Sequence, residues 1–144
     1  MILSRLTRIS LPKEEYLLLL GISISIFSSN YSFLIENILR NDTQQLYNWH
    51  DLVDVNRMKK IYSAVQKTIP QEHVEEIIEL LREIINLRNR IVHSFRITSS
   101  TNEQILATKN PDTQQQYEIN EEFLKAFIDF NNQLSDRLHD LRGF

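Results

Sequence analysis

Glycine occurs at only two of the 144 positions, Gly21 and Gly143. Average usage near 7% would give about ten, and glycine is the residue that supplies tight turns and phosphate-binding loops. With glycines so placed, no Gly-rich phosphate loop, dinucleotide-binding turn or nucleophile elbow can be written. A sandwich of many short strands joined by tight turns is also disfavoured. The scarcity of glycine therefore favours a helical fold and excludes several large classes of enzyme.

Length, cysteine content and charge narrow the choice further. The chain is long enough to bury one core, so we expect a single domain over residues 1–144. It contains no cysteine, which excludes disulfides, thiolate nucleophiles and Cys-ligated metals. The net charge of −3 does not favour nucleic acid or an anionic membrane, so any anion site must be local. The apolar stretch 17–27 is shorter than the roughly 20 residues that a bilayer requires, and we expect it to belong to the core of a cytoplasmic protein without a membrane partner.

Apolar residues recur at helical spacing in four segments of the chain. The predicted helices cover residues 12–39, 55–69, 70–94 and 120–142. Residues 41–49 are polar and are interpreted as a loop, whereas residues 95–118 break into short stretches typical of a small hairpin or a mobile loop. We therefore expect an all-α protein, a four- to five-helix up-and-down bundle with this insertion before the last helix.

The end of the third predicted helix carries the residues that suggest chemistry. Arg88 falls on the apolar stripe of that helix, where an unpaired charge is costly. Asn89 and His93 are four residues apart and share the neighbouring face. Arg88 and His93 lie about 140° apart around the helix and about 7.5 Å apart along it. They would converge most easily if a second copy of the helix approached across a two-fold axis.

The pattern Arg88-Asn89-x-x-x-His93, at the end of an apolar helix in a small bundle, resembles the Arg-x4–6-His motif of the HEPN superfamily. The resemblance implies a homodimer whose paired motifs form a metal-independent endoribonuclease site without a cofactor. His93 would then be the general acid and base, because histidine titrates near neutral pH. Arg88 would stabilise the phosphate and Asn89 would orient the site by hydrogen bonding.

Local charge near the motif agrees with an RNA substrate. Four arginines and one glutamate lie between residues 82 and 96, and Arg90 and Arg96 are the residues that we expect to bind RNA. The resemblance also implies a toxin or defence protein with an antitoxin or nucleotidyltransferase partner. Many toxin-type members carry, two residues after the histidine, a tyrosine that a partner nucleotidyltransferase modifies. This chain has Phe95 at that position and departs from that mode of control.

Other interpretations of the same residues stay open. A HEPN-like bundle without catalytic activity could bind a partner protein or a nucleotide through this surface, and a purely structural bundle would use it only as a dimer seam. In both cases Arg88 and His93 could simply pair with carboxylates and the helix dipole. Glu36 could add a carboxylate near the cleft. The group His50, Asp51 and Asp54 could ligate a metal, although capping of a loop is the better account of it.

Overall fold

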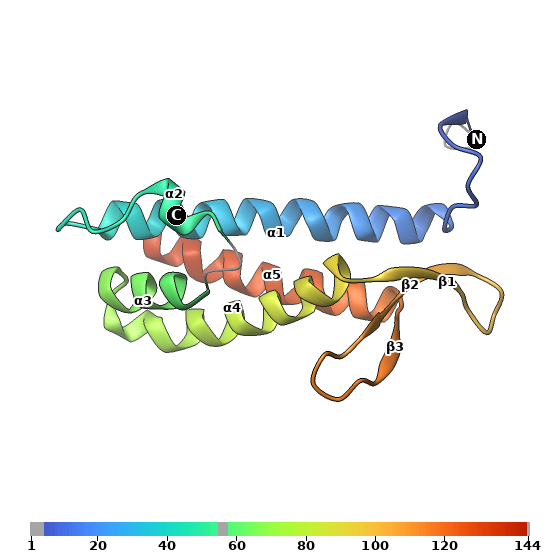
Figure 1. The fold of residues 1–144 in the computed structure, drawn as a ribbon. Coiled ribbons are helices and arrows are strands. Elements are labelled where there is room, and N and C mark those ends of the chain that lie inside the picture. The colour runs from blue at the N-terminus through green and yellow to red at the C-terminus, as the bar shows by residue number, and fades with distance from the viewer. Residues whose placement is uncertain (1–4, 55–57, 144) are drawn as a thin grey trace.

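The computed structural model of the chain describes residues 5–54 and 58–143. Most of these residues are helical, and a small antiparallel sheet lies at one end of the molecule (Figure 1). The elements in chain order are α1 (Glu14–Asn41), α2 (Trp49–Leu52), α3 (Met58–Thr68), α4 (Gln71–Val92), β1 (Phe95–Thr98), β2 (Gln104–Lys109), β3 (Gln116–Ile119) and α5 (Glu121–Arg142).

The four long predicted helices are present, and those of their expected ends that fall on described residues are correct within about two residues. The last helix shows why its ends could be predicted. The Asn120 side chain accepts a hydrogen bond from the Phe123 N–H at 2.8 Å, and Gly143 ends the helix with a φ of 78°. The predicted start of the second helix, residues 55–57, lies outside the described residues. The short helix α2 begins at the end of the predicted loop 41–49 and carries His50 and Asp51.

The prediction of an all-α protein is wrong for the segment between α4 and α5. Instead of a hairpin or loop, this segment forms a three-stranded antiparallel sheet in the order β1-β2-β3. The first two strands correspond to the two short apolar stretches that suggested a hairpin. The third strand joins because Ile119 is fully buried and pairs with Leu106. The turn before it is closed by Asn110, whose side chain accepts from the Asp112 and Thr113 N–H groups.

The long helices do not alternate in direction as an up-and-down bundle requires. Residues further along α1 contact residues further along α5. The Phe27 ring packs against that of Phe127, and Asn30 is hydrogen-bonded to Asn131. The two helices are therefore parallel neighbours, and α4 runs opposite to both (Figure 1). The physical reason is the segment after α1. This segment runs back along the bundle through α2, and α3 therefore runs parallel to α1.

A buried pair of asparagines joins α1 to α5. The Asn30 side-chain amide donates to the Asn131 backbone carbonyl at 2.7 Å and lies 3.2 Å from the Asn131 Oδ1. The Asn131 amide in turn donates to the Phe127 carbonyl at 2.9 Å. Both side chains are buried, so these bonds replace the water that each amide loses. The pair fixes where α1 sits along α5.

The two halves of α1 differ in burial. In its C-terminal half Leu34 and Ile38 are fully buried among α3 and α5. In its N-terminal half Leu18, Ile22 and Ile24 are exposed, so the expectation that stretch 17–27 belongs to the core is wrong for these three residues. The helix is long and apolar enough to cross a membrane, and 28% of its most apolar window is buried in the protein. The apolar face of α1 is therefore only partly covered.

The hydroxyl of Tyr16 connects the sheet to α1 by hydrogen bonds. This side chain is 1% exposed, donates a hydrogen bond to the Ile119 carbonyl at 2.6 Å and accepts one from the Leu106 N–H at 3.0 Å. Leu106 and Ile119 are register partners on β2 and β3. The hydroxyl is thus inserted between two strands at the end of their ladder. The sheet is an integral part of the fold and not a loose arm.

We expect Tyr16→Phe to lower the free energy of unfolding by about 1–3 kcal/mol, because it leaves a buried carbonyl and a partly buried N–H without a partner. Urea denaturation followed by circular dichroism measures this change. Tyr117→Phe on β3 is the matched control, since the Tyr117 side chain is only half-buried. Equal stability of the two variants would contradict the role assigned to the Tyr16 hydroxyl.

Candidate functional site

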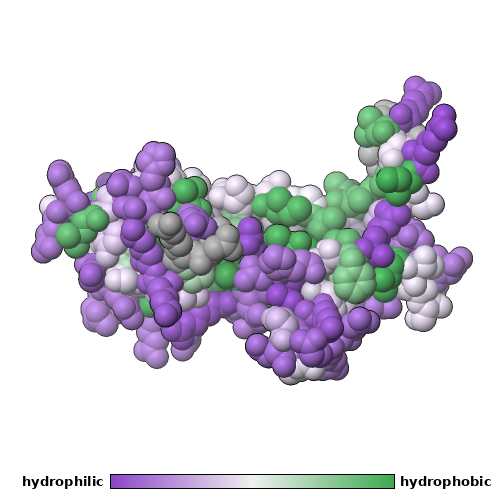
Figure 2. Space-filling model, viewed as in Figure 1, coloured by the Kyte–Doolittle hydropathy of each residue, from purple (hydrophilic) through white to green (hydrophobic). Residues whose placement is uncertain are grey.

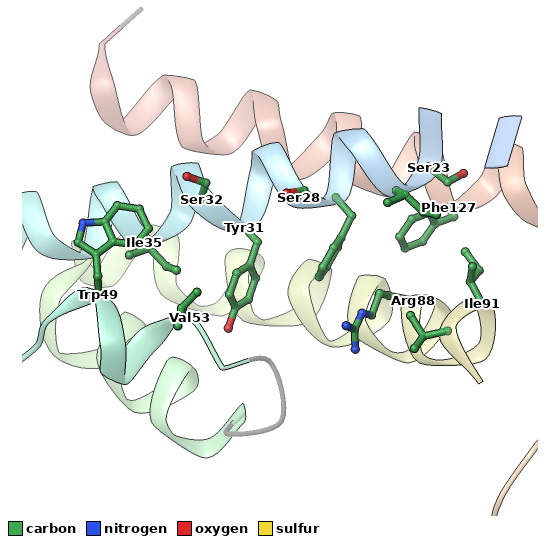
Figure 3. A pocket seen from close by; sticks show the side chains of 13 residues that line it. Ser23, Ser28, Tyr31, Ser32, Ile35, Trp49, Val53, Arg88, Ile91 and Phe127 are labelled. Atoms are coloured by element: carbon green, nitrogen blue, oxygen red, sulfur yellow. The ribbon is translucent and has the colours of Figure 1, made fainter. Parts of the chain in front are cut away.

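A groove of about 470 Å³ runs between α1 and α4 (Figure 3). Its volume lies within the range of small-ligand sites in proteins, about 300–1,000 Å³. Phe127 of α5 contributes to its lining. The other lining residues come from α1 between Ser23 and Ile35, from the α2 segment (Trp49 and Val53) and from the end of α4 (Arg88, Ile91 and Val92). One of the sequence-predicted site residues, Arg88, therefore lies in this groove.

Arg88 lies in the groove, where no carboxylate among residues 5–54 and 58–143 forms an ion pair with it. Its guanidinium carbon lies 5.7 Å from the centre of the Phe27 ring, and its Nη1 donates to the Asn89 Oδ1 at 3.1 Å. None of the ion pairs between described residues includes Arg88. Arginine cannot lose its proton, so the groove retains a positive charge whose remaining N–H groups are not bound to a carboxylate of the described chain. This differs from the alternative in which bundle carboxylates neutralise Arg88.

Aromatic side chains form the α1 wall of the groove. The Phe27 and Tyr31 rings are stacked, with centres 5.7 Å apart and planes 27° apart. The Phe27 ring also lies 6.2 Å from that of Phe127. The groove therefore contains a row of three side chains: the Arg88 guanidinium lies over the Phe27 ring, and the Phe27 ring stacks on that of Tyr31. Figure 3 shows Tyr31 and Arg88 both projecting from their helices into the space between α1 and α4.

Tyr31 holds the α2 segment against α1. Its hydroxyl donates to the Leu52 backbone carbonyl at 3.0 Å. Burial, together with the nearby negative charge of Asp54, raises the pKa of Tyr31 from 10.0 to about 12, and the positive charge of Arg88 partly opposes this rise. The hydroxyl therefore remains a neutral donor at physiological pH. The hydrogen bond keeps Trp49 and Val53 at the end of the groove.

The structure places His93 outside the groove. His93 ends α4 as its C-cap, with its backbone N–H bonded to the Asn89 carbonyl at 2.9 Å, and its side chain is exposed. It does not line the groove that contains Arg88. Within one chain the two residues face different directions, as the spacing on the helix predicts. A site that uses both therefore needs a second surface, or a second copy, to bring them together.

The two arginines expected to bind RNA are both half-buried. Arg90 donates through Nη1 to the Lys109 carbonyl, which ties α4 to strand β2. Its Nε is buried and has no hydrogen-bond partner within the described part of the chain. Arg96 lies on β1 opposite Leu106. Neither residue lines the groove, and Arg90 supports the junction between α4 and the sheet.

Two of the remaining candidates, Glu36 and Asp51, have partners in the structure. Glu36 lies 4.0 Å from Arg142 and does not line the groove. Asp51 forms an ion pair with Lys60 at 2.9 Å, and its N–H is bonded by the Asn48 side chain, which caps α2. Over residues 5–54 and 58–143 no group of three His, Cys, Asp or Glu side chains is placed to hold a metal ion. The cap of α2 is therefore Asn48, and Asp51 forms an ion pair instead of capping the loop.

Sequence reasoning missed the apolar rim of the groove. Four of its residues are large, apolar and about half exposed: Ile24 at 58%, Trp49 at 44%, Val53 at 55% and Val92 at 53%. Figure 2 shows hydrophobic side chains gathered on this face along α1. The available signal was Trp49, a large aromatic residue at the end of an otherwise polar stretch. Its position against the groove depends on α2, which the sequence pattern does not reveal.

Comparisons with protein-family models, with curated proteins and with solved structures found no match for this chain.

We expect the stability of Tyr31→Phe to depend less on alkaline pH than that of the wild type. A folded-state pKa of about 12 against 10.0 means that the neutral hydroxyl stabilises the fold fully below pH 10, and that this contribution is lost as the pH rises towards 12. Urea denaturation at several pH values between 9 and 12 measures the free energy of unfolding. Burial also raises the pKa of Tyr16 and Tyr62, so the difference between wild type and variant isolates Tyr31. Parallel curves for the two proteins would contradict the assignment.

Proposed function

We propose that the protein is a metal-independent endoribonuclease of the HEPN type, acting as a homodimer in the cytoplasm in a toxin or defence system. The observation that supports this most is Arg88, a permanent cation in an apolar groove without a described carboxylate partner. Retaining such a charge lowers stability unless an anion uses it. A phosphate of RNA is an anion of suitable geometry for a guanidinium.

The chemistry needs only the residues of the motif. A neutral His93 takes the proton from the ribose 2′-hydroxyl, whose oxygen attacks the adjacent phosphorus. The Arg88 N–H groups stabilise the charge that builds on the phosphate oxygens, and the leaving 5′-oxygen receives a proton from the same His93, which the first step has protonated. Asn89 holds the Arg88 guanidinium through the 3.1 Å hydrogen bond. The products are a 2′,3′-cyclic phosphate and a 5′-hydroxyl, and single-stranded RNA is the preferred substrate because its 2′-hydroxyl can move into line.

A second copy of the chain would complete the site. Exposed apolar side chains lie close to the motif in sequence or on the facing helix, and burying them would supply the energy of association. They are Ile22 and Ile24 of α1, Val92 of α4 and Phe95 of β1. Two-fold packing there would place the two α4 ends together. It would also cover the exposed face of α1 without a membrane.

The second candidate is a HEPN-like module without catalytic activity, which binds a partner protein or nucleotide in the groove. The observation that favours it is the position of His93 outside the groove. In this case Arg88 would still bind an anionic group, but no proton transfer would follow. An antitoxin or a nucleotidyltransferase remains the expected partner class under either proposal.

We expect the wild type to cut a mixed-sequence, single-stranded RNA in excess EDTA to products with cyclic phosphate ends, and His93→Ala to be at least about 100-fold slower, since general acid–base catalysis contributes 10²–10⁴-fold. Gel analysis with end-group identification measures both the rate and the chemistry. His73→Ala, near the opposite end of the same helix, is the control and should retain activity. Inert but folded wild type and variant would leave only the module without catalytic activity.

We expect a mixture of inactive Arg88→Ala and inactive His93→Ala proteins to regain up to about a quarter of the wild-type rate after subunit exchange. In the mixed dimer one site combines the intact Arg88 of one chain with the intact His93 of the other. Sites built within one chain would stay inactive in every combination. Absence of rescue, with exchange verified by native mass spectrometry, would contradict the composite site.

A further inference from the structure

We propose that the groove between α1 and α4 binds an unpaired segment of the RNA, with a base against Trp49 at the α2 end and a backbone phosphate at Arg88. This subsite rests on the proposed ribonuclease function, but it concerns binding, and it is tested without cleavage. The inference comes from the shape of the groove, from the residue types along it and from their order.

The groove changes in character from one end to the other. Arg88 supplies a positive charge at the α4 end. At the α2 end none of the described lining residues carries a charge. The apolar rings of Trp49 and Tyr31 lie there instead. A ligand with an aromatic part at one end and a negative charge at the other matches this order, and a nucleotide is such a ligand.

Trp49 has the two properties that stacking of a base requires, an exposed ring and a rigid support. It is 44% exposed at the rim, although a buried tryptophan would contribute more to stability. The single turn that carries it is held at three points: the Asn48 cap, the Asp51–Lys60 ion pair at 2.9 Å and the Tyr31–Leu52 hydrogen bond at 3.0 Å. An exposed ring on a rigid support loses little entropy when a base stacks on it.

The other aromatic rings already have partners. Phe27 carries the Arg88 guanidinium and stacks on Tyr31, whose hydroxyl is bonded to Leu52. These contacts keep Arg88 extended into the groove in the absence of ligand. Of the three aromatic side chains that line the groove from α1 and α2, Trp49 is therefore the one whose ring is exposed to receive a base. Figure 3 shows its indole at one end of the groove and Arg88 towards the other.

The test uses the fact that Trp49 is the only tryptophan of the chain, so its fluorescence reports on this site alone. The probe is a single-stranded pentanucleotide with 2′-O-methyl riboses, which lacks the attacking hydroxyl and cannot be cut. We expect saturable quenching of wild-type fluorescence by this probe and no quenching by inorganic phosphate. The apparent affinity should fall with added salt, because Arg88 binds a phosphate.

Substitution gives the second readout. Trp49→Leu should weaken binding of the fluorescein-labelled probe, measured by anisotropy, by about ten-fold, since base stacking on an aromatic side chain is worth 1–3 kcal/mol. Trp49→Phe, which keeps a ring, should fall between wild type and Trp49→Leu. Leu46→Ala is the control and should bind as the wild type, since Leu46 is another exposed apolar residue, in the loop before α2 and outside the groove. Equal affinities of wild type and Trp49→Leu would overturn the proposal.

The outcomes separate this proposal from the proposed function. Binding that depends on Trp49, without cleavage of ordinary RNA, would support the subsite and reject the ribonuclease. Cleavage that depends on His93 but has the same KM in Trp49→Leu would support the ribonuclease and reject the subsite. Fluorescence that changes with protein concentration alone, and not with the probe, would show that a second copy fills the groove, and would also reject the subsite.

Discussion

The contact between the Arg88 guanidinium and the Phe27 ring is the interaction on which the functional surface depends. It allows the permanent charge of Arg88 to lie on the apolar side of α4, because the face of an aromatic ring carries a partial negative charge that attracts a cation. An ion pair with a carboxylate would also have stabilised the arginine. It would, however, have used the N–H groups that a phosphate needs. The site thus keeps its charge available at a cost in stability that the surrounding aromatic packing offsets in part.

The course of the chain explains why this groove exists. Since α1 and α5 are parallel neighbours and α4 packs on α5, α1 and α4 face each other across the ring of Phe127 with few direct contacts. A regular up-and-down bundle would have closed this space with a fourth helix of matching length. Here the segment after α1 supplies only the single turn of α2 and the short α3. The groove is the part of the bundle that those short elements leave uncovered.

The sequence predicted those parts of the fold that depend on local chemistry. The caps at Asn120 and Gly143 and the apolar period of α4 correctly indicated the ends and the buried face of the helices. The sheet was predicted only in part, because β3 is stabilised by a distant residue, Tyr16, whose hydroxyl lies between the strands. The parallel arrangement of α1 and α5 was not predicted either, because it depends on contacts between residues far apart in the sequence, such as Asn30 and Asn131.

In the candidate site too, the features set by local helical geometry could be predicted and those set by tertiary contacts could not. The position of Arg88 on an apolar stripe and the different direction of His93 follow from helical geometry and could be predicted. The role of Arg90 could not, since its partner is a backbone carbonyl nineteen residues away on β2. Nor could the rim of the groove, because Trp49 and Ile24 look like core residues in any sequence pattern. Only the tertiary arrangement shows that they are left at the surface.

The asparagine pair between α1 and α5 has a consequence for how stiff this surface is. Apolar helices can slide past one another at little cost, because leucine and isoleucine contacts are much alike in adjacent registers. The buried Asn30 amide favours one register, since a shift of α1 along α5 would leave it without its bonds to Asn131, while the Asn131 amide keeps its bond to the Phe127 carbonyl of its own helix. Phe27 lies one turn before Asn30 on the same side of α1, and its ring packs against Phe127 of α5, so the register set by the asparagines also positions the ring that supports Arg88. The shape of the groove is therefore set when the bundle folds, before any ligand arrives.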